Sequence, residues 1–159
     1  MSTDFLSGRV GSMTARIVGA KRAPQAPRTI LVVDDDEPIR RLIDRALSRA
    51  GYTIVLAADG PEAIRVAAGS PSLDLLVTDM VMPDMNGSEV ARRLRQDRPN
   101  LKVLYFTGFS DRLFDEKVTM WDDEAFLEKP SSMPGLIEAV SLLWSDHIST
   151  AVNQSAEAR

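Results

Sequence analysis

The stretch TILVVDDDEPIRRLIDRALSRAG, residues 29–51, joins a short apolar run to a helical pattern. Its first part is rich in Val, Ile and Leu and ends on acidic residues, which is typical of a buried strand. In its second part the apolar residues recur at helical spacing up to Gly51, and glycine commonly follows the end of a helix. The stretch therefore predicts a strand that leads directly into a helix.

Four further apolar runs follow along the chain. They are YTIVLAA at 52–58, LDLLVTD at 73–79, KVLYFT at 102–107 and EAFLEK at 124–129. Helical patterns follow them: one that opens at Pro61, one through residues 88–96, a weaker one near 111–120 and one over 136–144. Repeated strand–helix units predict an α/β fold, a doubly wound sheet of five parallel strands with helices on both faces.

Length and composition limit the number of domains and the class of protein. The 159 residues, 44% of them hydrophobic and 26% charged, suffice for one compact domain with a real core. The chain has no cysteine, which excludes disulfides and thiolate metal sites and is compatible with a reducing cytoplasm. No run approaches the roughly 20 apolar residues that a membrane-spanning helix needs. We therefore expect a cytoplasmic protein without a membrane partner.

Charge is distributed unevenly between the first 28 residues and the remainder. The formal net charge is −4, but residues 1–28 carry five basic residues against Asp4 alone. This segment is rich in Ser, Gly, Ala and Pro without a sustained apolar period, so we expect a disordered basic arm. An organelle transit peptide, with Met13 as the true start, is the alternative. No nucleic-acid partner is expected, because the basic run lacks interleaved aromatic residues.

Polar residues stand at the carboxyl ends of four predicted strands: Asp34 and Asp35, Asp79, Thr107, and Lys129. The carboxyl ends of parallel strands lie on one edge of the sheet, so these side chains are expected to converge. Three carboxylates repel one another without a cation, and an oxygen-only ligand set favours Mg²⁺ or Mn²⁺. A cation, an acidic nucleophile, a hydroxyl and an ammonium together predict phosphoryl transfer.

Several of these residues also have a purely structural interpretation. One acid of the run DDDE, Asp36 or Glu37, is expected to cap the following helix, where a carboxylate accepts backbone N–H bonds. Thr107 could be only a β-branched strand residue, and Lys129 only a solvated strand end. Asp79 is harder to explain in this way, because a lone carboxylate at a buried sheet edge is costly without a partner.

These residues, in this order and at these separations, resemble the receiver domain of two-component response regulators, the CheY-like family. The acidic pair follows the first strand, Asp79 ends the third, Thr107-Gly108 ends the fourth, and Lys129-Pro130 ends the fifth. The resemblance implies a flavodoxin-like fold with strand order 2-1-3-4-5, in which the first and third strands are neighbours. It also implies a receiver domain over residues 29–147 and a short tail over 148–159.

The resemblance gives each polar residue a role. Asp79 would be the phosphoacceptor and would attack the phosphorus of a phosphohistidine on a partner. Mg²⁺ would be held by Asp34, Asp35, Asp79 and the backbone carbonyl of Val81, and would offset charge on the phosphoryl group. Lys129 would contact a phosphoryl oxygen as a point charge.

Thr107 and Phe126 would form the switch of such a receiver. The threonine would donate its hydroxyl to the phosphoryl group, and its shift would be coupled to the aromatic residue on the fifth strand, here Phe126 where many family members have Tyr. This coupling reshapes a binding surface. The resemblance also implies a cis peptide bond between Lys129 and Pro130.

Three apolar residues flank the predicted site. Val81 and Phe109 stand where receivers often carry side chains that help to place the attacking water. Neither has a hydrogen-bonding group, so we expect slow autodephosphorylation. Ile39, at the start of the first helix, either forms an apolar rim for a histidine phosphotransfer protein or belongs to the core, and the sequence leaves both open.

The sequence thus predicts a single-domain response regulator, not an enzyme, with a histidine kinase or histidine phosphotransfer protein and a downstream protein target as partners. Only residues 148–159 follow the last predicted helix, too few for an output module. The alternative is a haloacid-dehalogenase-like phosphatase, because Asp34 and Asp36 form a D-x-D element. Pro38 stands where that family has threonine, however, and no cap domain is available. The acylphosphate would form on Asp79 in a receiver and on Asp34 in the phosphatase.

Overall fold

The computed structural model describes residues 26–108, 123–129 and 131–145. Over residues 26–108 strands and helices alternate as the sequence predicts, and a fifth strand and a last helix lie in the other two ranges. The strands are β1 (Thr29–Val33), β2 (Thr53–Ala57), β3 (Leu75–Thr78), β4 (Lys102–Thr107) and β5 (Glu124–Glu128). The helices are α1 (Glu37–Arg49), α2 (Gly60–Ala68), α3 (Gly87–Asp97) and α5 (Met133–Leu143). The expected helix near 111–120, the arm up to residue 25 and the tail beyond residue 145 lie outside the described residues. Within the described ranges, none of the helices has the length and apolar character that crossing a membrane requires.

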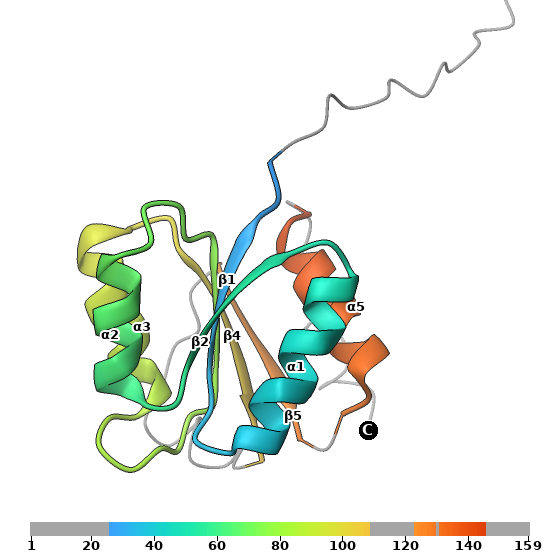
Figure 1. Ribbon diagram of the computed structural model, residues 1–159, viewed down its shortest axis with the longest axis horizontal. Coiled ribbons are helices and arrows are strands. Elements are labelled where there is room, and N and C mark those ends of the chain that lie inside the picture. The colour runs from blue at the N-terminus through green and yellow to red at the C-terminus, as the bar shows by residue number, and fades with distance from the viewer. Residues whose placement is uncertain (1–25, 109–122, 130, 146–159) are drawn as a thin grey trace, which may run out of the picture.

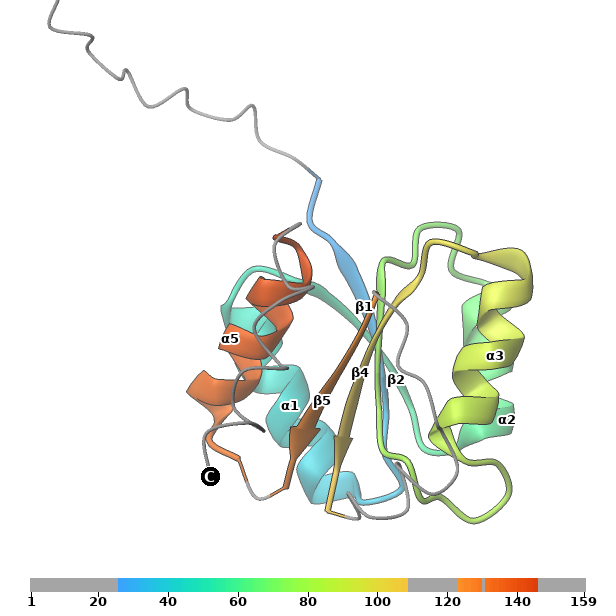
Figure 2. The ribbon, with the colours of Figure 1, turned by 180° about the vertical axis from the view of Figure 1, so that it is seen from behind.

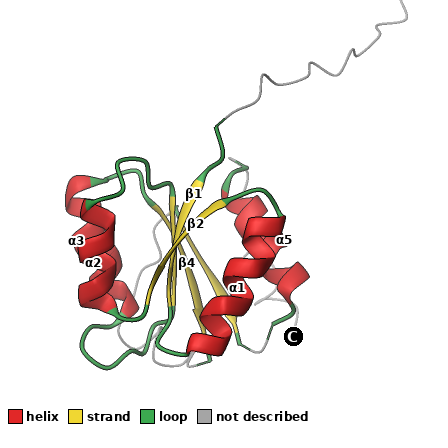
Figure 3. Cartoon of the chain, viewed as in Figure 1, coloured by secondary structure: helices red, strands yellow, loops and turns green. Residues whose placement is uncertain are grey.

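The five strands form one parallel sheet in the order β2-β1-β3-β4-β5, which confirms the predicted doubly wound fold. Helices α1 and α5 cover one face of the sheet, and α2 and α3 cover the other (Figures 1 and 2). Figure 3 shows the strands as a central layer between the two helix pairs. The strand order reverses between β1 and β3, and ligands of such sheets bind at the carboxyl edge beside this point.

Two apolar cores lie on opposite faces of the sheet. Leu31 and Val90 belong to the core beneath α2 and α3, whereas Ile30 and Ile43 belong to the core beneath α1 and α5. Neighbouring residues of β1 enter different cores because successive side chains of a strand point to opposite faces. This explains why the strands appear in the sequence as continuous apolar runs. Ile39 packs against the second core, which favours the core interpretation of this residue.

Polar caps and one glycine set the ends of the helices. Asp36 caps α1 by accepting a backbone N–H of the first turn at 3.3 Å, as predicted for one acid of the run. The caps of α2, α3 and α5 are Asp59, Asn86 and Ser132. Gly51 follows the end of α1 with a φ of +99°, a left-handed conformation that glycine adopts without steric cost.

Candidate functional site

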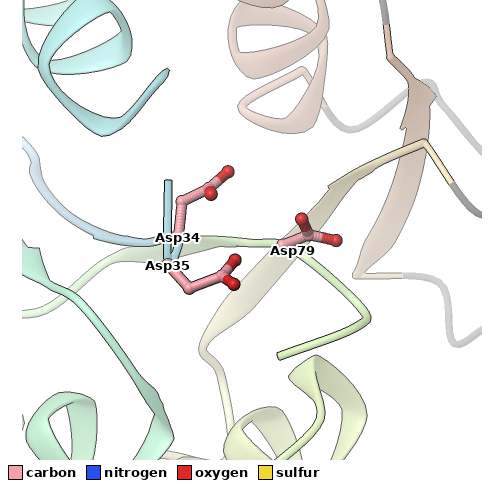
Figure 4. Close-up of side chains that lie close together, drawn as sticks. All are labelled: Asp34, Asp35 and Asp79. Carbon is pink, nitrogen blue, oxygen red and sulfur yellow. The ribbon is translucent and has the colours of Figure 1, made fainter. Parts of the chain in front are cut away.

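Two strand ends bring three acidic residues together at the carboxyl edge of the sheet. Val33 of β1 pairs in register with Thr78 of β3, and the Asp79 N–H donates to the Val33 carbonyl at 3.0 Å. The residues that follow β1 and β3 therefore begin adjacent loops. One carboxylate oxygen from each of Asp34, Asp35 and Asp79 lies within 4.8 Å of the others. Figure 4 shows the three side chains close together, as the strand order implied.

The three acids differ in exposure. Asp34 is 2% exposed and Asp79 8% exposed, whereas Asp35 is open to solvent. Burial raises the pKa of Asp34 above its ordinary value, and the hydrogen bonds from Lys129 and from the Asp36 amide offset this effect only in part. A cation bound at this edge would favour the ionised form of Asp34, because opposite charge lowers a carboxyl pKa.

Lys129 bridges two of the acids. Its Nζ lies 2.6 Å from Asp34 Oδ2 and 3.1 Å from Asp79 Oδ2. Burial, the largest single influence, lowers the pKa of Lys129, but the bonds with Asp34 and Asp79 together outweigh it and raise the pKa. The Lys129 N–H also donates to the Thr107 carbonyl at 2.9 Å, which fixes the end of β5 against β4. Lys129 is therefore a paired cation of the site and not a solvated strand end.

Thr107 ends β4 next to Lys129 and is fully buried. Among the described residues, the atom nearest to a Cβ added to Gly108 would be Lys129 Cβ at 3.9 Å, so the described backbone after Thr107 leaves room at the site. Phe126 pairs in register with Tyr105 and packs against the core beneath α2 and α3. Because side chains two positions apart on a strand point to the same face, Thr107 and Phe126 face the same side of the sheet.

The loop between β3 and α3 folds tightly over Asp79. The Val81 N–H donates to Asp79 Oδ1 at 3.2 Å, which places Val81 beside the carboxylate. Helix α3 comes so close that a Cβ on Gly87 would lie 2.2 Å from the Asp79 carbonyl oxygen. Phe109 and Pro130, which the sequence analysis placed beside the site, lie outside the described residues.

The donor set of this edge suits Mg²⁺. Asp34, Asp35 and Asp79 offer only carboxylate oxygens, which are hard ligands. Mg²⁺ usually retains several waters when one or two carboxylates bind it, and the solvent-exposed position of Asp35 is compatible with such waters. Lys129 neutralises part of the negative charge of the cluster, but a single ammonium cannot balance three carboxylates.

Arg40 contacts the site, although the sequence analysis did not single it out. Its Nη1 donates to the backbone carbonyl of Asp34 at 2.6 Å. The available signal was the spacing: an arginine six residues after a strand-end aspartate, early in the next helix, can reach back to that strand end.

A family model described as the response regulator receiver domain matches residues 30–141. The chain belongs to this family. It is therefore a receiver domain of two-component response regulators, a signalling module, and the match favours this function over the haloacid-dehalogenase-like phosphatase.

Individual proteins agree with the family match. The response regulator receiver protein CpdR of Brucella abortus is 34% identical over 113 residues, which cover 71% of this chain and 93% of CpdR. The sensor kinase CckA of the same species is 31% identical over 143 residues, which cover 79% of this chain but only 15% of the kinase. The structure of the response regulator TrrA of Thermotoga maritima, in complex with Mg²⁺-BeF, has a TM-score of 0.63 and 33% identity, covering 73% of this chain and 98% of TrrA.

Proposed function

We propose that this receiver domain accepts a phosphoryl group on Asp79 from the phosphohistidine of a histidine kinase or a histidine phosphotransfer protein. A carboxylate oxygen of Asp79 attacks the phosphorus, and the bond between phosphorus and the imidazole nitrogen breaks. The imidazole nitrogen keeps the electron pair and takes up a proton. The observation that carries this assignment is the constellation of Asp79, Asp34 and Lys129, in which one ammonium lies within 3.1 Å of both carboxylates.

We assign the metal ligands to Asp34, Asp35, Asp79 and the backbone carbonyl of Val81. When bound, Mg²⁺ would supply positive charge that offsets the charge on the transferring phosphoryl group. Mn²⁺, which takes the same oxygen donors, would serve as a substitute. The carboxylate cluster within 4.8 Å and the likeness to the Mg²⁺-BeF complex of TrrA support this assignment.

Lys129 and Thr107 would bind the phosphoryl group after transfer. Lys129 already lies against Asp79 Oδ2 and would exchange part of this contact for a phosphoryl oxygen. Thr107 would donate its hydroxyl to another phosphoryl oxygen. Phe126, on the same side of the sheet, would follow the shift of Thr107, so that phosphorylation alters the surface that a downstream protein target binds.

The functional unit that we propose extends over residues 29–147, with a basic arm over 1–28 and a tail over 148–159. The family match over residues 30–141 supports these bounds. We place the protein in the cytoplasm, and a chain without cysteine is compatible with that compartment. The proposal is confined to the actions of a receiver domain, because the chain spans 15% of CckA but 93% of CpdR.

Substitution of the phosphoacceptor tests the proposal. Asp79→Asn should abolish labelling of the purified protein by radiolabelled acetyl phosphate in Mg²⁺, because an amide cannot act as the nucleophile. Asp84→Asn is the matched control, since Asp84 is an exposed aspartate of the same loop. Circular dichroism should show that both variants are folded. Labelling of Asp79→Asn at the level of Asp84→Asn would contradict the proposal.

A further inference from the structure

Arg40 fixes the peptide group of Asp34 from the side of α1. Early in this helix, its own N–H donates to the Asp36 carbonyl at 2.9 Å, and its side chain turns back toward the sheet. Nη1 then reaches the Asp34 carbonyl at 2.6 Å. Hydrogen bonds from a charged donor are short and about twice as strong as neutral ones. The start of α1 and the end of β1 are therefore held together by the Arg40 side chain.

Every polar group of Asp34 has a partner. Its N–H donates to the Ala57 carbonyl at 3.3 Å, and its Oδ1 accepts the Asp36 N–H at 2.9 Å. Its Oδ2 accepts from Lys129 Nζ at 2.6 Å. The Lys129 bond is the one that a ligand would weaken. A bound cation would be a new partner for the Asp34 carboxylate, and a phosphoryl group would be a new partner for the Lys129 ammonium. The bond from Arg40 goes to the main chain and does not compete with a ligand of the carboxylate.

We propose that Arg40 is a positioning residue of the metal site: it holds the main chain of Asp34 so that the carboxylate stays directed at the cation when Lys129 changes partner. This inference rests on the proposed role of Asp34 as a metal ligand. The positive charge of Arg40 by itself weakens Mg²⁺ binding, because a guanidinium near the site repels a divalent cation. Loss of positioning therefore weakens Mg²⁺ binding, whereas loss of the charge alone strengthens it.

Arg41 provides a matched control for the charge. It is the next residue of α1, its guanidinium pairs with Glu37, and its side chain is 73% exposed. Arg41→Met removes one positive charge from this helix and leaves the Asp34 carbonyl bonded. Arg40→Met removes the same charge together with that bond. Arg40→Lys keeps the charge and can restore part of the contact.

Isothermal titration of the metal-free full chain with MgCl₂ measures the effect. We expect Arg40→Met to bind Mg²⁺ roughly tenfold more weakly than Arg41→Met, the lower end of the loss seen when groups that orient metal ligands are removed. Arg40→Lys should lie between Arg40→Met and the wild type. Binding by Arg40→Met that equals or exceeds that of Arg41→Met would overturn the role of Arg40.

Two further outcomes have defined meanings. If thermal melting without Mg²⁺ shows that Arg40→Met does not fold, Arg40→Lys is compared with Arg41→Lys; weaker Mg²⁺ binding by the former supports the inference and equal binding overturns it. If the wild type itself binds no Mg²⁺ at millimolar concentration, the metal site fails and the role of Arg40 fails with it. If the wild type binds Mg²⁺ but Arg40→Met binds it as tightly as Arg41→Met, only the role of Arg40 is overturned and the metal site stands.

Discussion

Gly87 lets helix α3 approach the main chain of Asp79 closely because it has no side chain. A Cβ at this position would lie 2.2 Å from the Asp79 carbonyl oxygen and 3.0 Å from Thr78 Cγ2. The Asp79 main chain cannot easily retreat, because its N–H is bonded to the Val33 carbonyl at 3.0 Å. Any side chain at position 87 must therefore push α3 away from the end of β3.

We expect Gly87→Ala to lower the free energy of unfolding by roughly 1–3 kcal/mol, the usual cost of overpacking. Labelling of Asp79 by acetyl phosphate should slow as well, because the loop that follows Asp79 must shift. Urea denaturation measures the first effect. Gly69→Ala is the control, since an added Cβ there meets its nearest neighbour in the described part of the chain, the Val66 carbonyl oxygen, at 3.7 Å. Equal stabilities of the two variants would show that the close approach of α3 is unimportant.

The acidic residues of the site could be predicted from the sequence, whereas Arg40 and Gly87 could not. Asp34 and Asp79 follow apolar runs, and the ends of parallel strands meet whatever the intervening loops do. The roles of Arg40 and Gly87 depend on how α1 and α3 cross the strand ends. The six-residue spacing from Asp34 allows the Arg40 contact but does not fix how α1 crosses the strand end, and no periodicity encodes the close approach of α3 at Gly87. Both contacts are therefore visible only in the folded chain.

At the scale of elements, a buried ion pair fixes the start of β5. Arg95 Nη1 lies 2.7 Å from Glu124 Oε1, and the Glu124 side chain is fully buried. Arg95 also donates to the Leu101 carbonyl at 3.0 Å and 2.9 Å. The Tyr105 hydroxyl lies 3.4 Å from the same carboxylate, and burial raises the pKa of Tyr105, which keeps its hydroxyl neutral. The network joins α3 to β4 and to β5, the strand that Lys129 directly follows.

Removal of one member of this pair should be costly. We expect Glu124→Ala to destabilise the fold by about 3–5 kcal/mol, because the Arg95 guanidinium loses its buried partner. Asp123→Ala, which breaks the more exposed pair with Lys102, should cost about 1 kcal/mol or less. Chemical denaturation of both variants provides the comparison. A Glu124→Ala that costs no more than Asp123→Ala would show that the network does not hold β5 in place.

The positions of the strands and helices were predictable because burial on both faces leaves strands without polar alternation, while helices keep an amphipathic period. The cap at Asp36 and the end of α1 at Gly51 were predictable as well, since both follow from local chemistry. Glu124 is different. In the sequence it looks like a charged strand start, and only the packing of Arg95 from α3 explains its burial.

For the whole molecule, the acidic edge leads us to expect that stability depends on divalent cations. Asp34 and Asp79 are buried beside the exposed Asp35, and among the described residues Lys129 is the cation that pairs with their carboxylates. Folding without a cation must therefore bring like charges together. A ligand that binds only the native state stabilises it in proportion to the logarithm of its concentration above the dissociation constant.

Mg²⁺ should accordingly raise the melting temperature of the wild type. At a concentration about 100 times the dissociation constant the gain is about 2.7 kcal/mol. Asp35→Ala should weaken this response. Asp84→Ala should retain it, because Asp84 is an exposed aspartate outside the cluster. Differential scanning fluorimetry over a series of Mg²⁺ concentrations measures the shift. A wild-type melting temperature that does not change over the series would exclude the metal site.

Location of the acylphosphate tests the central claim most directly. The purified chain is phosphorylated with acetyl phosphate in Mg²⁺, the acylphosphate is reduced with borohydride, and peptide mass spectrometry identifies the aspartate that has become homoserine. Conversion of Asp79, with Asp34 and Asp35 unchanged, is the expected result. Conversion of Asp34, or of any other residue with Asp79 intact, would contradict the assignment of Asp79 as the phosphoacceptor.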